Sequence, residues 1–162
     1  MTLSVGDTLP DATLLRLGEN GPEEVRLADL TADRTVVIFG VPGAYTGVCT
    51  TAHVPSFIRN KDKFDEQGVQ EIICVAVNDP FVVSAWAEST GADKAGITML
   101  ADPSAAFTKA IGMNFTAPPV GFFDRSKRYT MLVENGAVKI LNPEENPGQC
   151  EISAGETLLD QM

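Results

Sequence analysis

The sequence predicts an α/β protein in which helices cover both faces of a mixed β-sheet, with a β-hairpin at the N-terminal end. Two apolar runs, residues 35–40 and 71–77, do not alternate with polar residues, as is typical of parallel strands buried on both faces. Turn residues predict antiparallel hairpins at 11–27 and 129–141. Parallel strands joined by helices, with antiparallel strands at one edge, form a three-layer sandwich.

The first half of the chain supplies the hairpin and the first parallel pair of strands. Residues 11–27 predict two short strands around the turn-rich segment 18–22. The β-branched run 35–40 predicts a buried strand, and after a turn we expect a helical stretch of about residues 48–67. The run 71–77 then predicts a second strand parallel to the first, because a helix connects the two.

In the second half of the chain, capping and turn residues predict where helices and a hairpin begin. Residues 78–80, Asn-Asp-Pro, predict the start of a helix, and residues 134–136, Glu-Asn-Gly, predict the turn of a hairpin. Ser153 and Glu156 have the spacing of a capping box for a closing helix. The expected elements are, in order, a helix to about residue 88, a strand at 97–100, a short helix from 102, strands at 129–133 and 137–141, and a helix from 153 onwards. This order matches a thioredoxin-like sheet, and we expect residues 1–162 to form a single domain.

The charge of the chain argues against two classes of partner. The formal net charge is −10, from 22 acidic and 12 basic residues. An acidic surface repels phosphate groups, so neither nucleic acid nor an anionic membrane is an expected partner. The N-terminal residues lack the pattern of a signal or transit peptide, and no apolar run is long enough to span a bilayer. We therefore expect a soluble, cytoplasmic protein.

The three cysteines, Cys49, Cys74 and Cys150, are widely spaced and odd in number. This is not the pattern of a secreted disulfide framework, so in a reducing compartment they indicate either chemistry or packing. Cys74 lies in an apolar run and is expected to be a buried core residue. With His53, the other two cysteines fit no common zinc spacing, and we expect neither a metal nor a cofactor.

Cys49 stands where a strand ends and a helix begins. Unpaired N–H groups and the helix dipole stabilise a thiolate at that place, which lowers the pKa of the thiol. A decrease in pKa from about 8.5 to about 6 raises the thiolate fraction at neutral pH roughly thirtyfold. That gain is modest, so rapid chemistry also needs donors positioned around the reacting atoms.

Two neighbours of Cys49 are candidates for this task. Thr46 carries a hydroxyl that both donates and accepts, and Pro42 fixes the turn without offering an N–H. Each residue also has an ordinary interpretation: Cys49 as a packed core residue, Thr46 as a helix cap and Pro42 as part of a turn. Their combination at this spacing favours a reactive site. His53, four residues after Cys49, allows a Cys–His nucleophile pair as an alternative.

These residues belong to a longer pattern. Residues 39–49 have the sequence FGVPGAYTGVC and contain Pro42-x-x-x-Thr46-x-x-Cys49, and residues 53–57 add HVPSF. Further motifs follow in order at 77–82, Trp86, 100–103 and 127–131. With these motifs the chain closely resembles the type II, or peroxiredoxin-5-like, peroxiredoxins over essentially its whole length, which implies a thioredoxin-like fold.

By that resemblance, the chain is a thiol-dependent peroxidase that reduces hydrogen peroxide and organic hydroperoxides. Cys49 is then the peroxidatic cysteine, whose thiolate attacks a peroxide oxygen and becomes a sulfenic acid. The resemblance implies that Thr46 binds the peroxide, that Pro42 shields the pocket, and that Arg128 stabilises the thiolate and the transition state. Sequence context alone predicts that Arg128 lies in a solvated turn. The resemblance also implies a homodimer, and a structural or pocket-wall role for His53.

The route by which the sulfenic acid is reduced stays open at the level of the sequence. Cys150 lies in a loop that we expect to be exposed, and in some relatives a cysteine in this region is the resolving thiol. The loop is slightly shorter here than in those relatives, and a disulfide requires Cα atoms within about 7 Å. The expected reductant is thioredoxin if Cys150 resolves the sulfenic acid, and glutathione or glutaredoxin if it does not.

Residues 112–127 show little periodicity and contain Phe115, Phe122 and Phe123. A structureless loop of this length is typically functional, so we expect these aromatic side chains to line the peroxide pocket or a dimer contact. Two other classes of protein stay open. One is a Cys–His acyl-transfer enzyme, for which a third orienting residue is lacking, and the other is a redox sensor that retains the fold without turnover.

Overall fold

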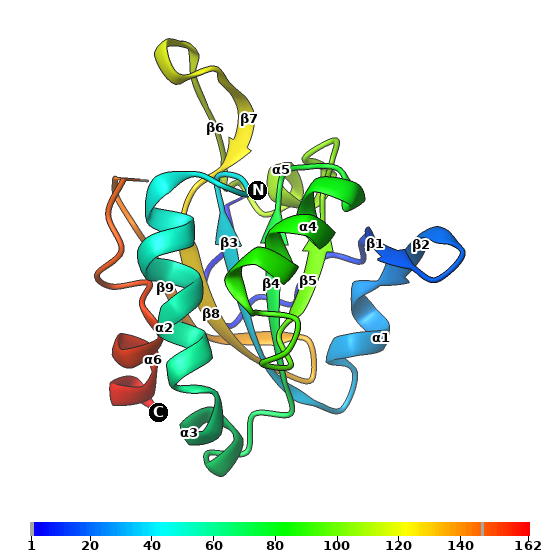
Figure 1. The fold of residues 1–162 in the computed structure, drawn as a ribbon. Helices are drawn as coiled ribbons and strands as arrows, with labels where there is room; N and C mark the ends of the chain where they lie inside the picture. Colours follow the sequence, from blue (N-terminus) through cyan, green and yellow to red (C-terminus); the bar gives the residue numbers. More distant parts are fainter. Residues whose placement is uncertain (1, 147) are drawn as a thin grey trace.

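The computed structural model describes residues 2–146 and 148–162, and for Cys49 the backbone alone. In this part of the chain one large sheet forms the middle layer, and helices lie on both of its faces (Figure 1). The strands of this sheet are β1 (Thr13–Gly18), β2 (Gly21–Arg26), β3 (Thr35–Val41), β4 (Glu71–Ala76), β5 (Thr98–Ala101), β8 (Tyr129–Glu134) and β9 (Ala137–Pro143). The helices are α1 (Leu27–Thr31), the π-helix η1 (Cys49–His53), α2 (Val54–Arg59), α3 (Lys61–Glu66), α4 (Pro80–Thr90), α5 (Ala106–Ala110) and α6 (Gly155–Gln161). None of the helices in the described residues has the length and apolar character that a membrane span needs.

The strand order of the large sheet is β2-β1-β5-β4-β3-β8-β9, and the predicted mixed α/β sandwich is confirmed. The three central strands β3, β4 and β5 are parallel, whereas β1 and β8 pair antiparallel with β5 and β3. The predicted hairpins are both present, as β1 with β2 and β8 with β9. The loop after β3 therefore leaves the carboxyl end of a central parallel strand, where open α/β sheets usually bind ligands.

Alternating side chains of the central strands build two apolar cores. Val37 and Phe39 of β3 belong to one core together with residues of α2, α4 and α6. Val36 and Ile38 belong to the other core, with residues of α5 and the N-terminal segment. Cys74 on β4 is buried in the first core, as predicted.

β3 and β8 approach each other closely at Gly40 and Tyr129, which are partners in the register. A Cβ atom on Gly40 would lie 2.2 Å from Cε1 of Tyr129, so the ring fits only against a glycine. This contact fixes the start of β8, and with it the position of Arg128, the residue before Tyr129.

Residues 112–127 do not form the structureless loop that we expected. β6 (Asn114–Ala117) pairs antiparallel with β7 (Phe122–Ser126), and the 3₁₀ turn η2 (Pro118–Val120) joins them. The register shifts between Phe115 and Ala117, which disrupts the alternation from which a strand is recognised. We call residues 114–126 the pocket hairpin; it projects from the body of the fold (Figure 1).

The helical stretch expected at about residues 48–67 is present, divided into η1, α2 and α3 with a break at Asn60. The predicted capping box of the last helix was wrong. Ser153 is not the N-cap of the last helix, because α6 begins at Gly155 after Ala154 and has no side-chain cap. Ser153 is buried, and its N–H and hydroxyl both donate to the carboxylate of Glu144. A polar contact with a residue outside the capping box thus overrides the local capping pattern.

Candidate active site

The loop after β3 places the first two site residues predicted from the sequence. Pro42 is buried directly after the strand, and Tyr45 has a φ of 64°. Left-handed conformations of residues other than glycine cost energy and cluster at functional sites. The Thr46 hydroxyl donates to the carbonyl oxygen of Gly43 at 2.8 Å, and the Thr46 carbonyl accepts from the N–H of Thr50 at 3.1 Å. Thr46 therefore connects the turn to the first turn of the helix.

Cys49 is the first residue of η1 and follows two helical residues, 47 and 48. Its backbone therefore lies in the first turns of a helix, where free N–H groups and the dipole favour an anion. The side chain of Cys49 lies outside the described part of the structure. The four-residue spacing of Cys49 and His53, which allowed a Cys–His pair on an α-helix, falls instead on a wider π-helix. Trp86 of α4 supports this turn, because its Nε1 donates to the Thr50 hydroxyl at 3.0 Å.

Two side chains from distant elements hold the loop after β3. Asn78, which follows β4, accepts from the N–H of Ala44 at 2.7 Å through its Oδ1 atom. Arg125 of β7 donates from Nη1 to the carbonyl oxygen of Pro42 at 3.2 Å. A Cβ atom on Gly43 would lie 2.4 Å from the same Nη1 atom, so glycine leaves the room that Arg125 occupies.

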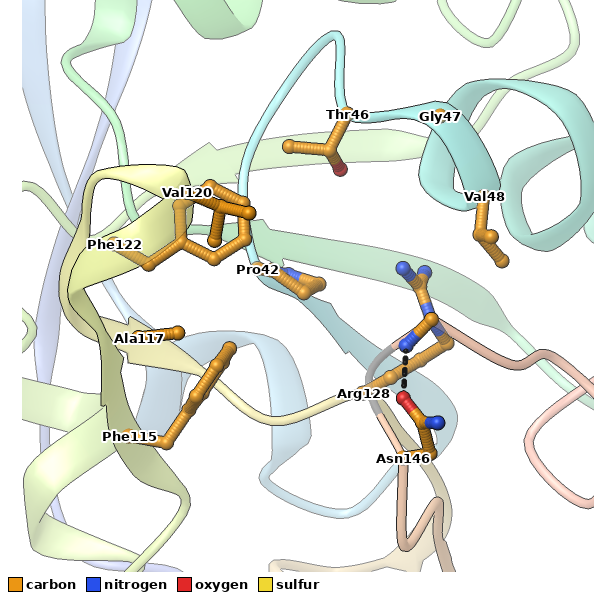
Figure 2. Close-up of a pocket in the computed structure, with 11 residues that line it drawn as sticks. Pro42, Thr46, Gly47, Val48, Phe115, Ala117, Val120, Phe122, Arg128 and Asn146 are labelled. Atoms are coloured by element: carbon orange, nitrogen blue, oxygen red, sulfur yellow. Dashed lines mark hydrogen bonds between the residues drawn. The ribbon is translucent and has the colours of Figure 1, made fainter.

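The loop, the pocket hairpin and Arg128 surround a cavity of about 440 Å³ (Figure 2). Thr46 and Arg128 supply polar groups to this cavity, and Pro42 lies between them and the hairpin. The apolar wall consists of Phe115, Ala117, Val120 and Phe122. Of the aromatic residues expected to line the peroxide pocket or a dimer contact, Phe115 and Phe122 line this cavity, whereas Phe123 is exposed. Val48, the residue before Cys49, also lines the cavity, so the structure brings Pro42, Thr46 and Arg128 together beside the Cys49 backbone.

Arg128 is buried, with 1% of its surface exposed, so the prediction of a solvated turn was wrong. Its side chain extends into the cavity (Figure 2), and Nη1 donates to Nδ1 of His53 at 3.1 Å. Its carbonyl oxygen accepts from the N–H of Glu144 at 2.8 Å. A buried positive charge is costly unless polar or anionic groups face it. The cavity is therefore suited to an anionic group or to a reaction in which negative charge develops.

His53, the partner of Arg128, is completely buried. Its Nε2 atom lies 3.1 Å from the carbonyl oxygen of Ser153 and 3.2 Å from the hydroxyl of Thr130. Burial, and then the charge of Arg128, hold the pKa of His53 well below its ordinary value, so the ring is neutral. Both ring nitrogens thus have partners other than a cysteine. This arrangement does not support the Cys–His acyl-transfer alternative.

Cys150 lies between β9 and α6 and is half-buried, where the sequence predicted an exposed loop. The Oε2 atom of the buried Glu144 accepts from the N–H of Glu151 at 2.7 Å, and from the N–H and the hydroxyl of Ser153 at 2.9 and 2.7 Å. The Ser153 hydroxyl also lies 3.9 Å from Sγ of Cys150. Burial raises the pKa of the Cys150 thiol, so in this conformation the thiol is protonated at neutral pH.

Sequence reasoning missed Arg125 and Asn78 as residues that support the site. Both act on the loop after β3 from elements far along the chain. Asn78 lies in the run 78–80, which indicated only the start of a helix. For Arg125 the available signal was a second arginine three residues before Arg128, at the end of an aromatic-rich segment.

Comparisons with known proteins identify the family. The Redoxin family model matches residues 4–159. Peroxiredoxin-2C of rice (Oryza sativa subsp. japonica) is 42% identical over 99% of this chain and 98% of its own length. Rice Peroxiredoxin-2E-2, chloroplastic, is 43% identical over 97% of this chain and 72% of its own length. The crystal structure of reduced Prx3 from Vibrio vulnificus in complex with hydrogen peroxide is 42% identical, with a TM-score of 0.91 over 99% of both chains. The chain therefore belongs to the type II peroxiredoxins of the thioredoxin-like superfamily, and it is a thiol-dependent peroxidase.

Proposed function

We propose that Cys49 is the peroxidatic cysteine and that Thr46, Pro42 and Arg128 form its catalytic surroundings. The observation that supports this proposal is the cavity of about 440 Å³ in which these three residues meet beside Val48, directly before Cys49. The cavity is larger than hydrogen peroxide requires, and its apolar wall suits the alkyl group of an organic hydroperoxide.

In the proposed reaction, the thiolate sulfur of Cys49 attacks one peroxide oxygen. A sulfur–oxygen bond forms and the O–O bond breaks, so that two electrons pass from sulfur to the peroxide. The departing oxygen takes up the peroxide proton and leaves as water or an alcohol, and the sulfur becomes a sulfenate, which takes a proton from solvent to give the sulfenic acid. Because negative charge develops on the departing oxygen, fixed donors around it lower the barrier.

The surrounding residues fit distinct parts of this step. Arg128 supplies a buried positive charge for the thiolate and for the departing oxygen. The Thr46 hydroxyl directs its own proton to Gly43, so its oxygen serves as the acceptor for the peroxide O–H. Pro42 is buried and has no N–H, and it shields the reacting atoms from water.

Peroxide consumption in the presence of a thiol reductant tests the assignment of Cys49. The variant Cys49→Ser is expected to lose turnover, whereas Cys74→Ser, at a buried position in the core, is expected to retain most of it. Substantial turnover by a correctly folded Cys49→Ser variant would contradict the proposal.

A thiol reductant completes the cycle, and we propose either thioredoxin or glutathione with glutaredoxin, depending on the role of Cys150. Reduced protein treated with one equivalent of hydrogen peroxide, alkylated and mapped by peptide mass separates the two routes. A Cys49–Cys150 disulfide assigns resolution to Cys150 and points to thioredoxin. Sulfenic acid on Cys49 with an alkylated Cys150 points to glutathione and glutaredoxin.

We also propose that the protein is a single-domain homodimer of the cytoplasm. Three large apolar side chains near the cavity are exposed: Tyr45 at 55%, Val120 at 65% and Phe123 at 64%. Clustered exposed apolar residues usually mark a protein contact, and a second copy of the chain would cover them. The cytoplasmic location is supported by the odd number and wide spacing of the three cysteines, which do not fit a secreted disulfide framework. Sedimentation of Phe123→Glu, expected to be a monomer, tests the dimer, and cell fractionation tests the location.

A further inference from the structure

The direction of the Arg128 guanidinium is set in part by a buried histidine. Arg128 enters the cavity from the junction of β7 and β8. Its Nη1 atom donates to Nδ1 of His53 at 3.1 Å, and both residues are 1% exposed or less. A long, flexible side chain keeps one orientation only if its donors have fixed partners.

The hydrogen-bond pattern determines which nitrogen of His53 carries the proton. Arginine has donors and no acceptor, so Nδ1 of His53 is the acceptor and carries no proton. In the neutral ring the proton is then on Nε2, which faces the carbonyl oxygen of Ser153 at 3.1 Å. The Thr130 hydroxyl donates its own proton to the same carbonyl oxygen, so the hydroxyl does not compete as a donor to Nε2.

The other end of this arrangement is also fixed. Ser153, whose carbonyl accepts from His53, donates through its N–H and its hydroxyl to the buried carboxylate of Glu144. The N–H of Glu144 in turn donates to the carbonyl of Arg128. These bonds close a ring of contacts that leads from Arg128 through His53 and Ser153 back to the Arg128 backbone. His53 therefore bonds at Nε2 to the segment that carries Cys150, and at Nδ1 to the guanidinium of Arg128.

We propose that His53 is a positioning residue for the peroxide step. Its Nε2–H, bonded to Ser153, presents the unprotonated Nδ1 to Arg128 and so aims the guanidinium into the cavity. This proposal rests on the role proposed above for Arg128, because His53 itself contacts no reacting atom. A shift of Ser153 relative to His53 would then be transmitted to Arg128.

Two substitutions of His53 test separately its hydrogen bond to Arg128 and its hydrogen bond to Ser153. In asparagine the amide oxygen stands two bonds from Cβ, like Nδ1, so His53→Asn retains an acceptor for Arg128. In glutamine the amide group stands three bonds from Cβ, like Nε2, so His53→Gln retains a donor to Ser153 and loses the acceptor for Arg128. We expect His53→Gln to slow the oxidation of Cys49 by hydrogen peroxide about tenfold, and His53→Asn to recover most of that loss.

The rates are measured by stopped flow at a pH where the Cys49 thiolate is fully formed in each variant, so that a changed thiol pKa does not contribute. Thermal unfolding checks that both variants fold. In an Arg128→Ala background, His53→Gln is expected to cause no further loss, because there is no guanidinium left to position. Equal rates for folded His53→Asn and His53→Gln, or a full additional loss in the Arg128→Ala background, would overturn the proposal.

Arg128→Ala alone distinguishes a failure of this inference from a failure of the proposed function. If Arg128→Ala is slow while His53→Gln reacts like the unmodified protein, only the positioning role fails. If Arg128→Ala retains the normal rate, the catalytic role of Arg128 fails and the positioning role with it.

The tautomer of His53 can also be measured directly in the unmodified protein. His53 is the one histidine of the sequence, so a sample labelled with ¹⁵N-histidine gives a single pair of ring resonances. At neutral pH we expect a protonated Nε2 and an unprotonated Nδ1. The opposite tautomer, or a doubly protonated ring, would contradict the proposal.

Discussion

Arg125 donates a hydrogen bond from Nη1 to the carbonyl oxygen of Pro42, 3.2 Å away, and so joins the pocket hairpin to the loop that leads to Cys49. The same guanidinium lies over the ring of Phe122, with its central carbon 5.3 Å from the ring centre. One side chain thus connects two walls of the cavity. The spacing between the apolar wall and the reactive loop depends on it.

Arg125→Ala is expected to lower the free energy of unfolding by about 2 kcal/mol, because a charged hydrogen bond and a cation–π contact are lost. We also expect the oxidation of Cys49 to slow roughly tenfold through a misplaced loop. Urea denaturation and stopped-flow oxidation check the two effects. Lys127→Ala removes the same charge from an exposed neighbour and serves as the control. Equal behaviour of the two variants would show that Arg125 acts only through its charge.

Thr46→Val keeps the shape of the side chain and removes its hydroxyl. The variant loses the bond to Gly43 and the acceptor for the peroxide, so we expect the rate of Cys49 oxidation to fall by about a hundredfold. Thr46→Ser retains the hydroxyl and should stay within roughly threefold of the unmodified protein. Kinetics of peroxide consumption compare the two variants. A fast Thr46→Val variant would remove the hydroxyl from the mechanism.

Glu144→Ala is expected to destabilise the protein by about 3 kcal/mol. The substitution leaves three donors, one on Glu151 and two on Ser153, without their shared acceptor. Glu145→Ala, at the exposed neighbouring position, is the matched control and should change stability by less than about 0.5 kcal/mol. Denaturant titration measures both values. Similar losses at the two positions would mean that the buried carboxylate does not hold this segment.

His53 gives the stability of the protein a specific pH dependence. The pKa of this residue is lowered in the folded protein, whereas in the unfolded chain it is about 6.5. Between these two pKa values the unfolded chain binds more protons, so stability falls as the pH decreases below about 6.5. The slope approaches about 1.4 kcal/mol per pH unit.

Because His53 is the one histidine, His53→Asn is expected to remove most of this slope between about pH 5 and 6.5, where carboxylates contribute little. Denaturant midpoints measured across that range provide the check. A slope that persists in the variant would assign the dependence to other groups.

Local signals in the sequence predicted local structure well. Asp79 accepts from the N–H of Val82 and Pro80 begins α4, as the Asn-Asp-Pro run indicated, and Gly136 lies in the turn of the predicted hairpin. The capping prediction failed because a residue outside the local motif decides the outcome. Ser153 has the spacing of a cap, but its hydroxyl bonds to the buried Glu144.

The site divides in the same way. Thr46 and Pro42 could be proposed from their spacing to Cys49, since the loop that carries them is local. The role of Arg128 was predicted only from the resemblance to a family. Its burial results from contacts with His53 and Glu144, which its neighbours in the sequence do not indicate. The pocket hairpin was missed since a shifted register and two prolines obscure its pattern.

The pairing of β3 with β8 also has a consequence for how the protein acquires its activity. Gly40 and Tyr129 are partners although they are 89 positions apart in the chain, and the closure of such a long loop is slow compared with the formation of a helix. A partly folded chain can therefore present Cys49 with Thr46 nearby before Arg128 has arrived. We expect the return of peroxidase activity during refolding to follow this long-range pairing. Until then Cys49 of a nascent chain should behave as an ordinary thiol.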